Sequence, residues 1–129
     1  MLKGAFKLLR ISALPSALAD VLGGSALALA ALPWVPHAHF AREKLPWLVL
    51  TSVGIYLGGM GLNDLLHRHK DAALNKPRPI VTGAISVEVA ALLTSLLYAM
   101  GLGASVFAGC AVLALVLALA TVAYNALAL

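Results

Sequence analysis

Four long apolar segments constrain this chain more than any other feature of its sequence. They run from about Leu8 to Leu32, Leu45 to Leu62, Ala84 to Met100 and Ser105 to Leu127, with charged or proline-rich residues between them. Each is close to the roughly 20 residues that a helix needs to cross a bilayer core. Unpaired backbone groups are too costly in hydrocarbon, so we expect four helices. The predicted fold is all-α, a polytopic transmembrane helix bundle with four spans in a single domain over residues 1–129.

The composition excludes an ordinary soluble domain. Hydrophobic residues make up 62% of the chain and charged residues only 11%, against about a quarter charged in soluble domains. The net charge of +4 would suit nucleic acid, but long apolar runs interrupt the nine lysines and arginines, which form no stripe with interleaved aromatic residues. We therefore expect no nucleic-acid partner and a lipid bilayer as the surroundings.

The positive charges divide unequally between the two sides that four spans would create. Seven of them precede the first segment or lie between the second and the third: Lys3, Lys7, Arg10, Arg68, Lys70, Lys76 and Arg78. Only Arg42 and Lys44 fall on the other side. Because basic loops stay in the cytoplasm, we expect a multi-pass protein of the cell membrane. Both termini and the loop after the second span are expected to be cytoplasmic, with Arg10 as a topology anchor.

The first apolar segment has an alternative interpretation as a cleaved signal peptide. Basic residues precede it, and Ala28-Leu29-Ala30 is a plausible small-residue cleavage site. Pro15, Asp20 and the Gly23-Gly24 pair interrupt the apolar run that such a peptide requires, so we favour a span. Asp20 lies inside this segment, where a charge is costly; it is either a functional residue or a protonated or paired structural acid.

Many glycines also lie inside the apolar segments. They are Gly54, Gly58, Gly59, Gly61, Gly101, Gly103 and Gly109. No strand precedes them, as a phosphate-binding loop would require, so we expect close helix contacts at these positions.

The segment NDLLHRHKDAALNKPRPIVTG, residues 63–83, holds six of the fourteen acidic and basic side chains. A second helix that continued past Gly61 would carry four polar side chains along one face, at spacings of three and four residues. They are Asn63, Asp64, His67 and Asp71. Carboxylates at this spacing suit Mg²⁺, which takes oxygen ligands, keeps several waters and is commonly completed by phosphate oxygens.

The basic residues of the same segment suit a phosphate group. Lys76 and Arg78 follow the acids, and Arg68 and Lys70 lie between Asp64 and Asp71, so these side chains would balance phosphate charge. The alternative is a solvated cytoplasmic loop in which Asp64 pairs with Arg68 and Asp71 is a helix-end charge. Spacing alone leaves both interpretations open.

These residues resemble the first aspartate-rich motif of the UbiA superfamily of intramembrane prenyltransferases, NDxxDxxxD followed by RPxxxG. This chain reads Asn63-Asp64-x-x-His67-x-x-x-Asp71 and then Arg78-Pro79-Ile80-Val81-Thr82-Gly83. The basic N-terminus, the place of the motif after the second segment and the third segment that follows the Arg-Pro turn also agree. The resemblance covers essentially all of the chain.

The resemblance implies a bundle of about nine helices, by analogy of fold. Two aspartate-rich motifs would hold Mg²⁺ on a prenyl diphosphate, and ionisation of its allylic C–O bond would let the isoprenyl group alkylate a lipophilic, aromatic acceptor. The expected metal ligands are Asp64, Asp71 and the variant position His67. The expected diphosphate-binding residues are Asn63, Arg68, Lys76 and Arg78. Arg10, expected to be a topology anchor, could also reach the diphosphate. No catalytic residue is assigned.

Two departures from the family pattern matter. His67 replaces the middle acid, and a neutral imidazole prefers softer metals than Mg²⁺. A non-catalytic, transporter-like bundle that binds a transition metal through Asp64, His67, His69 and Asp71 therefore remains an alternative. The second departure is that no DxxxD follows Asp71. We accordingly expect the chain to be the N-terminal half of a longer prenyltransferase, inactive without its C-terminal half.

Overall fold

The described part of the chain folds entirely into helices. The computed structural model describes residues 2–32, 34 and 36–128, and every regular element among them is helical. In chain order the elements are α1 (Leu2–Leu8), the 3₁₀ helix η1 (Ile11–Ala13), α2 (Leu14–Ala31), α3 (His37–Glu43), α4 (Leu45–Leu66), α5 (Arg68–Ala73), α6 (Val87–Ala108) and α7 (Ala111–Leu127). The prediction of an all-α fold is confirmed.

Three helical stretches are long and apolar enough to cross a membrane. They are Ile11–Ala31, Leu45–Leu66 and Val87–Ala108. The fourth apolar helix, α7, has 17 residues, which is at the short end of the range of about 17–25 residues for spanning helices. The chain is an integral membrane protein, and its fourth span stays a prediction.

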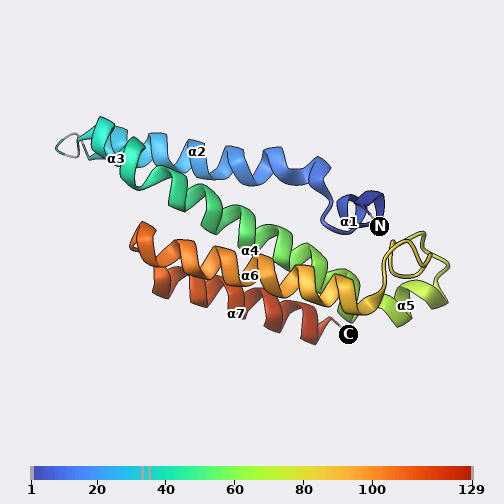
Figure 1. Ribbon diagram of the computed structural model, residues 1–129. Helices are drawn as coiled ribbons and strands as arrows, with labels where there is room; N and C mark the ends of the chain where they lie inside the picture. Colours follow the sequence, from blue (N-terminus) through green and yellow to red (C-terminus); the bar gives the residue numbers. More distant parts are fainter. Residues whose placement is uncertain (1, 33, 35, 129) are drawn as a thin grey trace.

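The long helices lie side by side and alternate in direction (Figure 1). One end of the bundle, called the motif end here, carries α1, α5, residues 74–86 and both marked ends of the chain. The opposite end carries α3 and the turn between α6 and α7. The helical hairpins thus bring the basic N-terminal residues and the basic loop after α4 to one end, as the charge pattern predicted.

A seam of glycines holds α4 against α6. A Cβ on Gly54 would lie 2.7 Å from the backbone of Gly101, and one on Gly58 would lie 3.0 Å from the ring of Tyr98. Small residues let helix backbones approach closely in lipid, where van der Waals packing drives association. The prediction of close helix contacts is confirmed here, but it is wrong for Gly103, because a Cβ there would meet nothing within 4 Å.

The boundary between the last two helices differs from the predicted one. The sequence predicted a break between residues 100 and 105, whereas α6 continues to Ala108. Gly101 lies in the seam with α4 and does not break the helix. The break falls at Gly109, whose φ of 82° is left-handed and caps α6. Glycine adopts this conformation without the steric cost of a Cβ, so Gly109 serves as a cap rather than as a helix contact.

An apolar cluster at the motif end fixes the chain near the polar residues described below. It joins Leu8 of α1, Leu65 of α4, Ile85 of the loop and Ala90 of α6. Leu8 and Ala90 are fully buried. The cluster anchors α1 and the loop to the ends of α4 and α6, so both segments have fixed positions.

Candidate functional site

The polar motif follows α4 with only a small interruption. His67, with φ −88° and ψ 6°, separates α4 from α5, yet the backbone hydrogen bonds keep helical spacing. The amide of His67 donates to the carbonyl of Asn63 at 3.0 Å, and that of Asp71 donates to the carbonyl of His67 at 2.8 Å. The prediction that the second helix continues past Gly61 is confirmed.

The two acids of the motif are buried. Asp64 is 2% exposed, Asp71 is 3% exposed, and His67 is buried as well. The alternative of a solvated loop with exposed acids is therefore wrong. Asp64 also does not pair with Arg68, whose guanidinium donates to the carbonyl of Leu65 at 2.8 Å.

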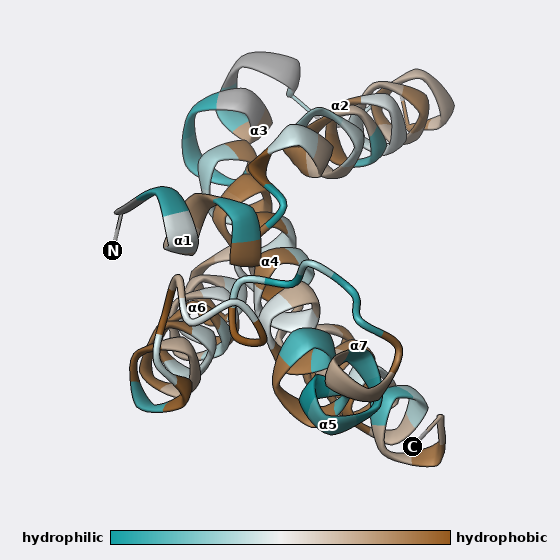
Figure 2. Cartoon of the chain, turned by 90° about the vertical axis from the view of Figure 1, so that its right-hand side faces the viewer, coloured by the Kyte–Doolittle hydropathy of each residue, from teal (hydrophilic) through white to brown (hydrophobic). Residues whose placement is uncertain are grey.

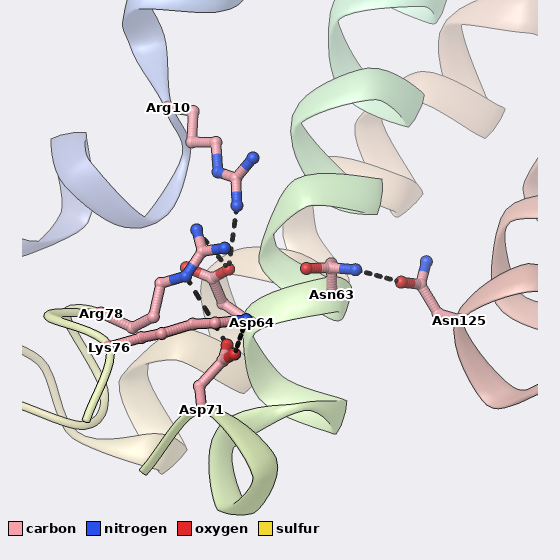
Figure 3. A network of polar contacts seen from close by, with 7 residues as sticks. All are labelled: Arg10, Asn63, Asp64, Asp71, Lys76, Arg78 and Asn125. Atoms are coloured by element: carbon pink, nitrogen blue, oxygen red, sulfur yellow. Dashed lines mark hydrogen bonds and ion pairs between the residues drawn. The ribbon is translucent and has the colours of Figure 1, made fainter. Parts of the chain in front are cut away.

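Asn63 faces a different direction from the acids, so the expectation that it shares their face is wrong. Its Nδ2 donates to Oδ1 of Asn125 in α7 at 2.8 Å. Figure 3 shows Asn63 reaching toward α7, whereas Asp64 reaches toward the N-terminal segment and the loop. Successive residues of an α-helix differ in direction by about 100°, which separates these neighbours.

Two left-handed residues turn the loop, and the first turn brings the basic residues back to the acids. Asn75 follows α5 with a φ of 53°, a left-handed conformation that asparagine tolerates. The next amide, of Lys76, donates to the carbonyl of Asp71 at 2.9 Å. Further on, the loop turns again at Gly83, whose φ is 70°. A left-handed glycine thus explains the last position of the Arg-Pro-x-x-x-Gly pattern.

The resulting acid cluster consists of Asp64, Asp71, Arg10, Lys76 and Arg78 (Figure 3). Lys76 Nζ lies 3.0 Å from Asp71 Oδ1. Arg78 bridges both acids, with Nη1 3.5 Å from Asp64 Oδ1 and Nε 3.6 Å from Asp71 Oδ2. Arg10 Nη2 approaches the same oxygen, Asp64 Oδ1, at 3.7 Å.

Asp64 is the least satisfied member of this cluster. Both of its carboxylate oxygens are buried, and neither accepts a hydrogen bond from the residues that the structure describes. Its two arginine partners lie at 3.5 Å and 3.7 Å, beyond the usual hydrogen-bond length of about 2.7–3.2 Å. A buried carboxylate needs partners to offset its lost hydration, so Asp64 has capacity for a further cation.

The donor set fits Mg²⁺ better than a transition metal. Within residues 2–32, 34 and 36–128, no three His, Cys, Asp or Glu side chains are placed to hold one metal ion. His69 is exposed, whereas Asp64 and Asp71 are buried, so the proposed transition-metal set is not assembled. Two carboxylates, with waters and phosphate oxygens completing the shell, are a usual environment for Mg²⁺. The unpartnered oxygens of Asp64 fit this role.

A large cavity begins beside the acid cluster. It has a volume of about 970 Å³, is walled by α2, α4 and α7, and has a mostly apolar surface. Arg10, Asn63 and Asn125 line it at the motif end, and Phe40 of α3 lines it near the opposite end. Asp20 of α2 also lines this cavity. Arg10 therefore belongs to both the cavity wall and the acid cluster.

The model of the UbiA prenyltransferase family matches residues 18–129. The chain belongs to the UbiA prenyltransferase family. The match includes the whole segment from Asn63 to Gly83, so the resemblance found in the sequence is confirmed. No curated protein and no solved structure matches the chain.

Two residues of the site in this UbiA family member were missing from the predicted set. Arg10 was expected to be a topology anchor that could also reach a diphosphate, but its position 3.7 Å from Asp64 was not predicted. Its left-handed φ of 45° could not be read from the sequence. Asn125 was not considered, although it is a polar residue within an apolar segment. Such residues are costly in lipid and often functional, which was the available signal.

Proposed function

We propose that the acid cluster binds the diphosphate of an isoprenyl donor together with Mg²⁺. The apolar cavity holds the isoprenyl chain, for transfer to a lipophilic, aromatic acceptor. The observation that carries this proposal is the position of Arg10. Arg10 pairs with Asp64 and also lines the cavity. The acid cluster and the cavity therefore adjoin, so one ligand can place its diphosphate in the cluster and its isoprenyl chain in the cavity.

The charges of the cluster suit a diphosphate. Three cations, Arg10, Lys76 and Arg78, face two carboxylates, which leaves one excess positive charge among these side chains. Arginine presents a planar fork of donors that matches phosphate oxygens. Arg78 is held only by long ion pairs, at 3.5 Å and 3.6 Å. Its donors can therefore turn to phosphate oxygens without breaking a short hydrogen bond to either acid.

Asp64 and Asp71 would hold the Mg²⁺, whose positive charge offsets negative charge on a leaving diphosphate. Arg10 and Arg78, which both approach Oδ1 of Asp64, stabilise the same developing charge. These interactions are stronger in a site from which water is excluded. Lys76 lies closest to Asp71, at 3.0 Å, and orients this acid.

The cavity suits an isoprenyl chain by size and composition. Its volume of about 970 Å³ lies near the upper end of the range of about 300–1,000 Å³ for small-molecule sites. Burial of apolar surface contributes about 0.8 kcal/mol for each CH₂ group. The polar cavity residues Asp20 and Tyr56 are candidates for contact with the acceptor, and the role of Asp20 stays a prediction.

A binding titration tests this function. Purified protein in lipid nanodiscs is titrated with a non-cleavable prenyl thiodiphosphate, with and without Mg²⁺. We expect binding that requires Mg²⁺ and is weakened about tenfold or more by Lys76→Ala. Lys70→Ala is the matched control, because Lys70 is an exposed lysine of the same segment. Tight Zn²⁺ binding without any effect of the diphosphate would instead support the transition-metal alternative and rule out the donor site.

We also propose that the motif end faces the cytoplasm. The native Cys110, the only cysteine of the chain, follows α6 at the opposite end. In intact cells, a membrane-impermeant maleimide should label Cys110. In a Cys110→Ala background it should label Arg42→Cys and leave Lys70→Cys unmodified. Labelling of Lys70→Cys alone would reverse the proposed orientation.

A further inference from the structure

A pair of asparagines joins two helices beside the acid cluster. Asn63 of α4 donates through Nδ2 to Oδ1 of Asn125 in α7, at 2.8 Å. Asn125 is 3% exposed and lies in an otherwise apolar helix. Nothing in the charges of the cluster requires an amide at position 125.

The hydrogen bonds fix the direction of both amides. Nδ2 of Asn125 donates to the backbone carbonyl of Thr121, one turn earlier in α7, at 2.9 Å. A carbonyl can only accept, so Asn125 must turn its Nδ2 to Thr121 and its Oδ1 to Asn63. Asn63 must then turn its Nδ2 to Asn125, which leaves its Oδ1 on the other side. In Figure 3 this oxygen points away from Asn125, toward the side where Arg10 and Asp64 lie.

Close packing of α4 against α7 keeps these hydrogen bonds in place. A Cβ on Gly59 would lie 2.8 Å from Cγ2 of Thr121, so α4 and α7 approach closely at Thr121, whose carbonyl accepts the hydrogen bond from Asn125. Thr121 is itself held by a hydrogen bond from its Oγ1 to the carbonyl of Leu117, at 2.8 Å. The carbonyl that orients Asn125 thus belongs to a helix turn pressed against α4.

We infer that Asn125 is a positioning residue that orients the amide of Asn63, so that Asn63 offers an oxygen rather than an NH₂ group to the Mg²⁺ that binds with the diphosphate. The inference rests on the proposed function. Mg²⁺ takes oxygen ligands, directly or through water, and the opposite amide orientation would direct two N–H donors at the cation. Residues that orient a metal ligand through a hydrogen bond typically alter metal affinity by about 10–100-fold when they are removed.

The test compares the loss of Asn125 in two backgrounds. Mn²⁺ replaces Mg²⁺, and its binding in the presence of a prenyl thiodiphosphate is followed by electron paramagnetic resonance in nanodiscs. In the parent protein, Asn125→Ala should weaken Mn²⁺ binding by about 10–100-fold. In an Asn63→Asp background it should cause no further weakening, because the two carboxylate oxygens are equivalent and have no wrong orientation, and because the loss of Asn125 removes an oxygen that would face the new carboxylate.

A merely structural role for Asn125 would give the same loss in both backgrounds, and that result would overturn the inference, as would full binding by Asn125→Ala in the parent protein. Asn125→Ser, whose hydroxyl is too short to replace the amide, serves in the same comparison if Asn125→Ala does not fold. Asp64→Ala separates the two proposals. If Asp64→Ala retains diphosphate-dependent Mn²⁺ binding, the proposed function fails; if it abolishes binding while Asn125→Ala does not change it, only the positioning role fails.

Discussion

The two ends of the bundle differ in whether their charged side chains have hydrogen-bond partners. At the opposite end, Lys44 Nζ donates to the carbonyl of Phe107 at 3.1 Å. The ring of Phe107 stacks on Trp47, with centroids 4.7 Å apart. At the motif end, Asp64 is buried, and no residue that the structure describes donates a hydrogen bond to its oxygens.

The difference indicates that the polar and aromatic contacts at the opposite end are structural, whereas the buried acid at the motif end is functional. The contacts of Lys44 and Trp47 complete the end of α6 and hold it to α4. Asp64 gains only long ion pairs in return for its burial. Charged groups whose surroundings leave them incompletely satisfied concentrate at functional sites. Figure 2, which views the motif end, shows the hydrophilic stretches of α1, α5 and the loop gathered around the end of α4.

The largest effect is expected for Asp64→Ala. Losing a carboxylate that contacts metal or diphosphate should weaken Mg²⁺-dependent binding of a prenyl thiodiphosphate by about a hundredfold or more. The measurement is the nanodisc titration described above. Glu43→Ala is the control at the opposite end, because its exposed carboxylate contacts only His39, at 3.4 Å. If both variants bind as the parent does, the contrast between the two ends has no functional meaning.

Gly54→Ala should disturb both ends at once, because α4 and α6 connect them. The new Cβ would lie 2.7 Å from the backbone of Gly101, which cannot move without separating the helices. Overpacking of this kind costs about 1–3 kcal/mol, measured as the free energy of unfolding in mixed micelles. Gly103→Ala, where a Cβ meets open space, should be neutral or slightly stabilising, since alanine favours helix more than glycine. Equal destabilisation by the two variants would contradict the inference that close packing at Gly54 holds α4 against α6.

The features set by local patterns were predictable from the sequence. Apolar length gave the α4 and α6 spans, and helical spacing predicted that Asp64 and Asp71 share one face. The break after α6 was misplaced because glycines inside an apolar run look alike. Only tertiary contact shows that Gly101 packs against α4, whereas Gly109 adopts a left-handed φ of 82°.

The features set by contacts between distant segments were not predictable. Arg10 reaches Asp64 because the buried Leu8 anchors α1, and no spacing rule connects positions 10 and 64. Asn125 meets Asn63 only because α7 packs against α4. A charge or an amide could be assigned to the site by its chemistry, but its partner depended on how the helices pack.

His67→Asp tests whether the motif end is a weakened Mg²⁺ site. The variant adds a hard, negative oxygen ligand between Asp64 and Asp71, where three cations face only two acids. We expect about tenfold tighter Mg²⁺-dependent diphosphate binding, which corresponds to about 1.4 kcal/mol. His69→Asp is the matched control, because His69 lies two residues later in α5, is exposed and should change binding little. Weaker binding by His67→Asp would show that the histidine has a role of its own.

The smallest effect is expected at the opposite end, for Trp47→Ala. Aromatic pairs contribute about 0.5–1.5 kcal/mol beyond burial, so losing the stack on Phe107 should lower the free energy of unfolding modestly. Binding of the prenyl thiodiphosphate should be unchanged, because Trp47 lines neither the acid cluster nor the cavity. Trp34→Ala is the control: Trp34 is 75% exposed, so its loss should leave stability nearly unaffected. A Trp47→Ala protein that unfolds normally but loses diphosphate binding would show that the two ends are coupled, and the division between a structural end and a functional end would be wrong.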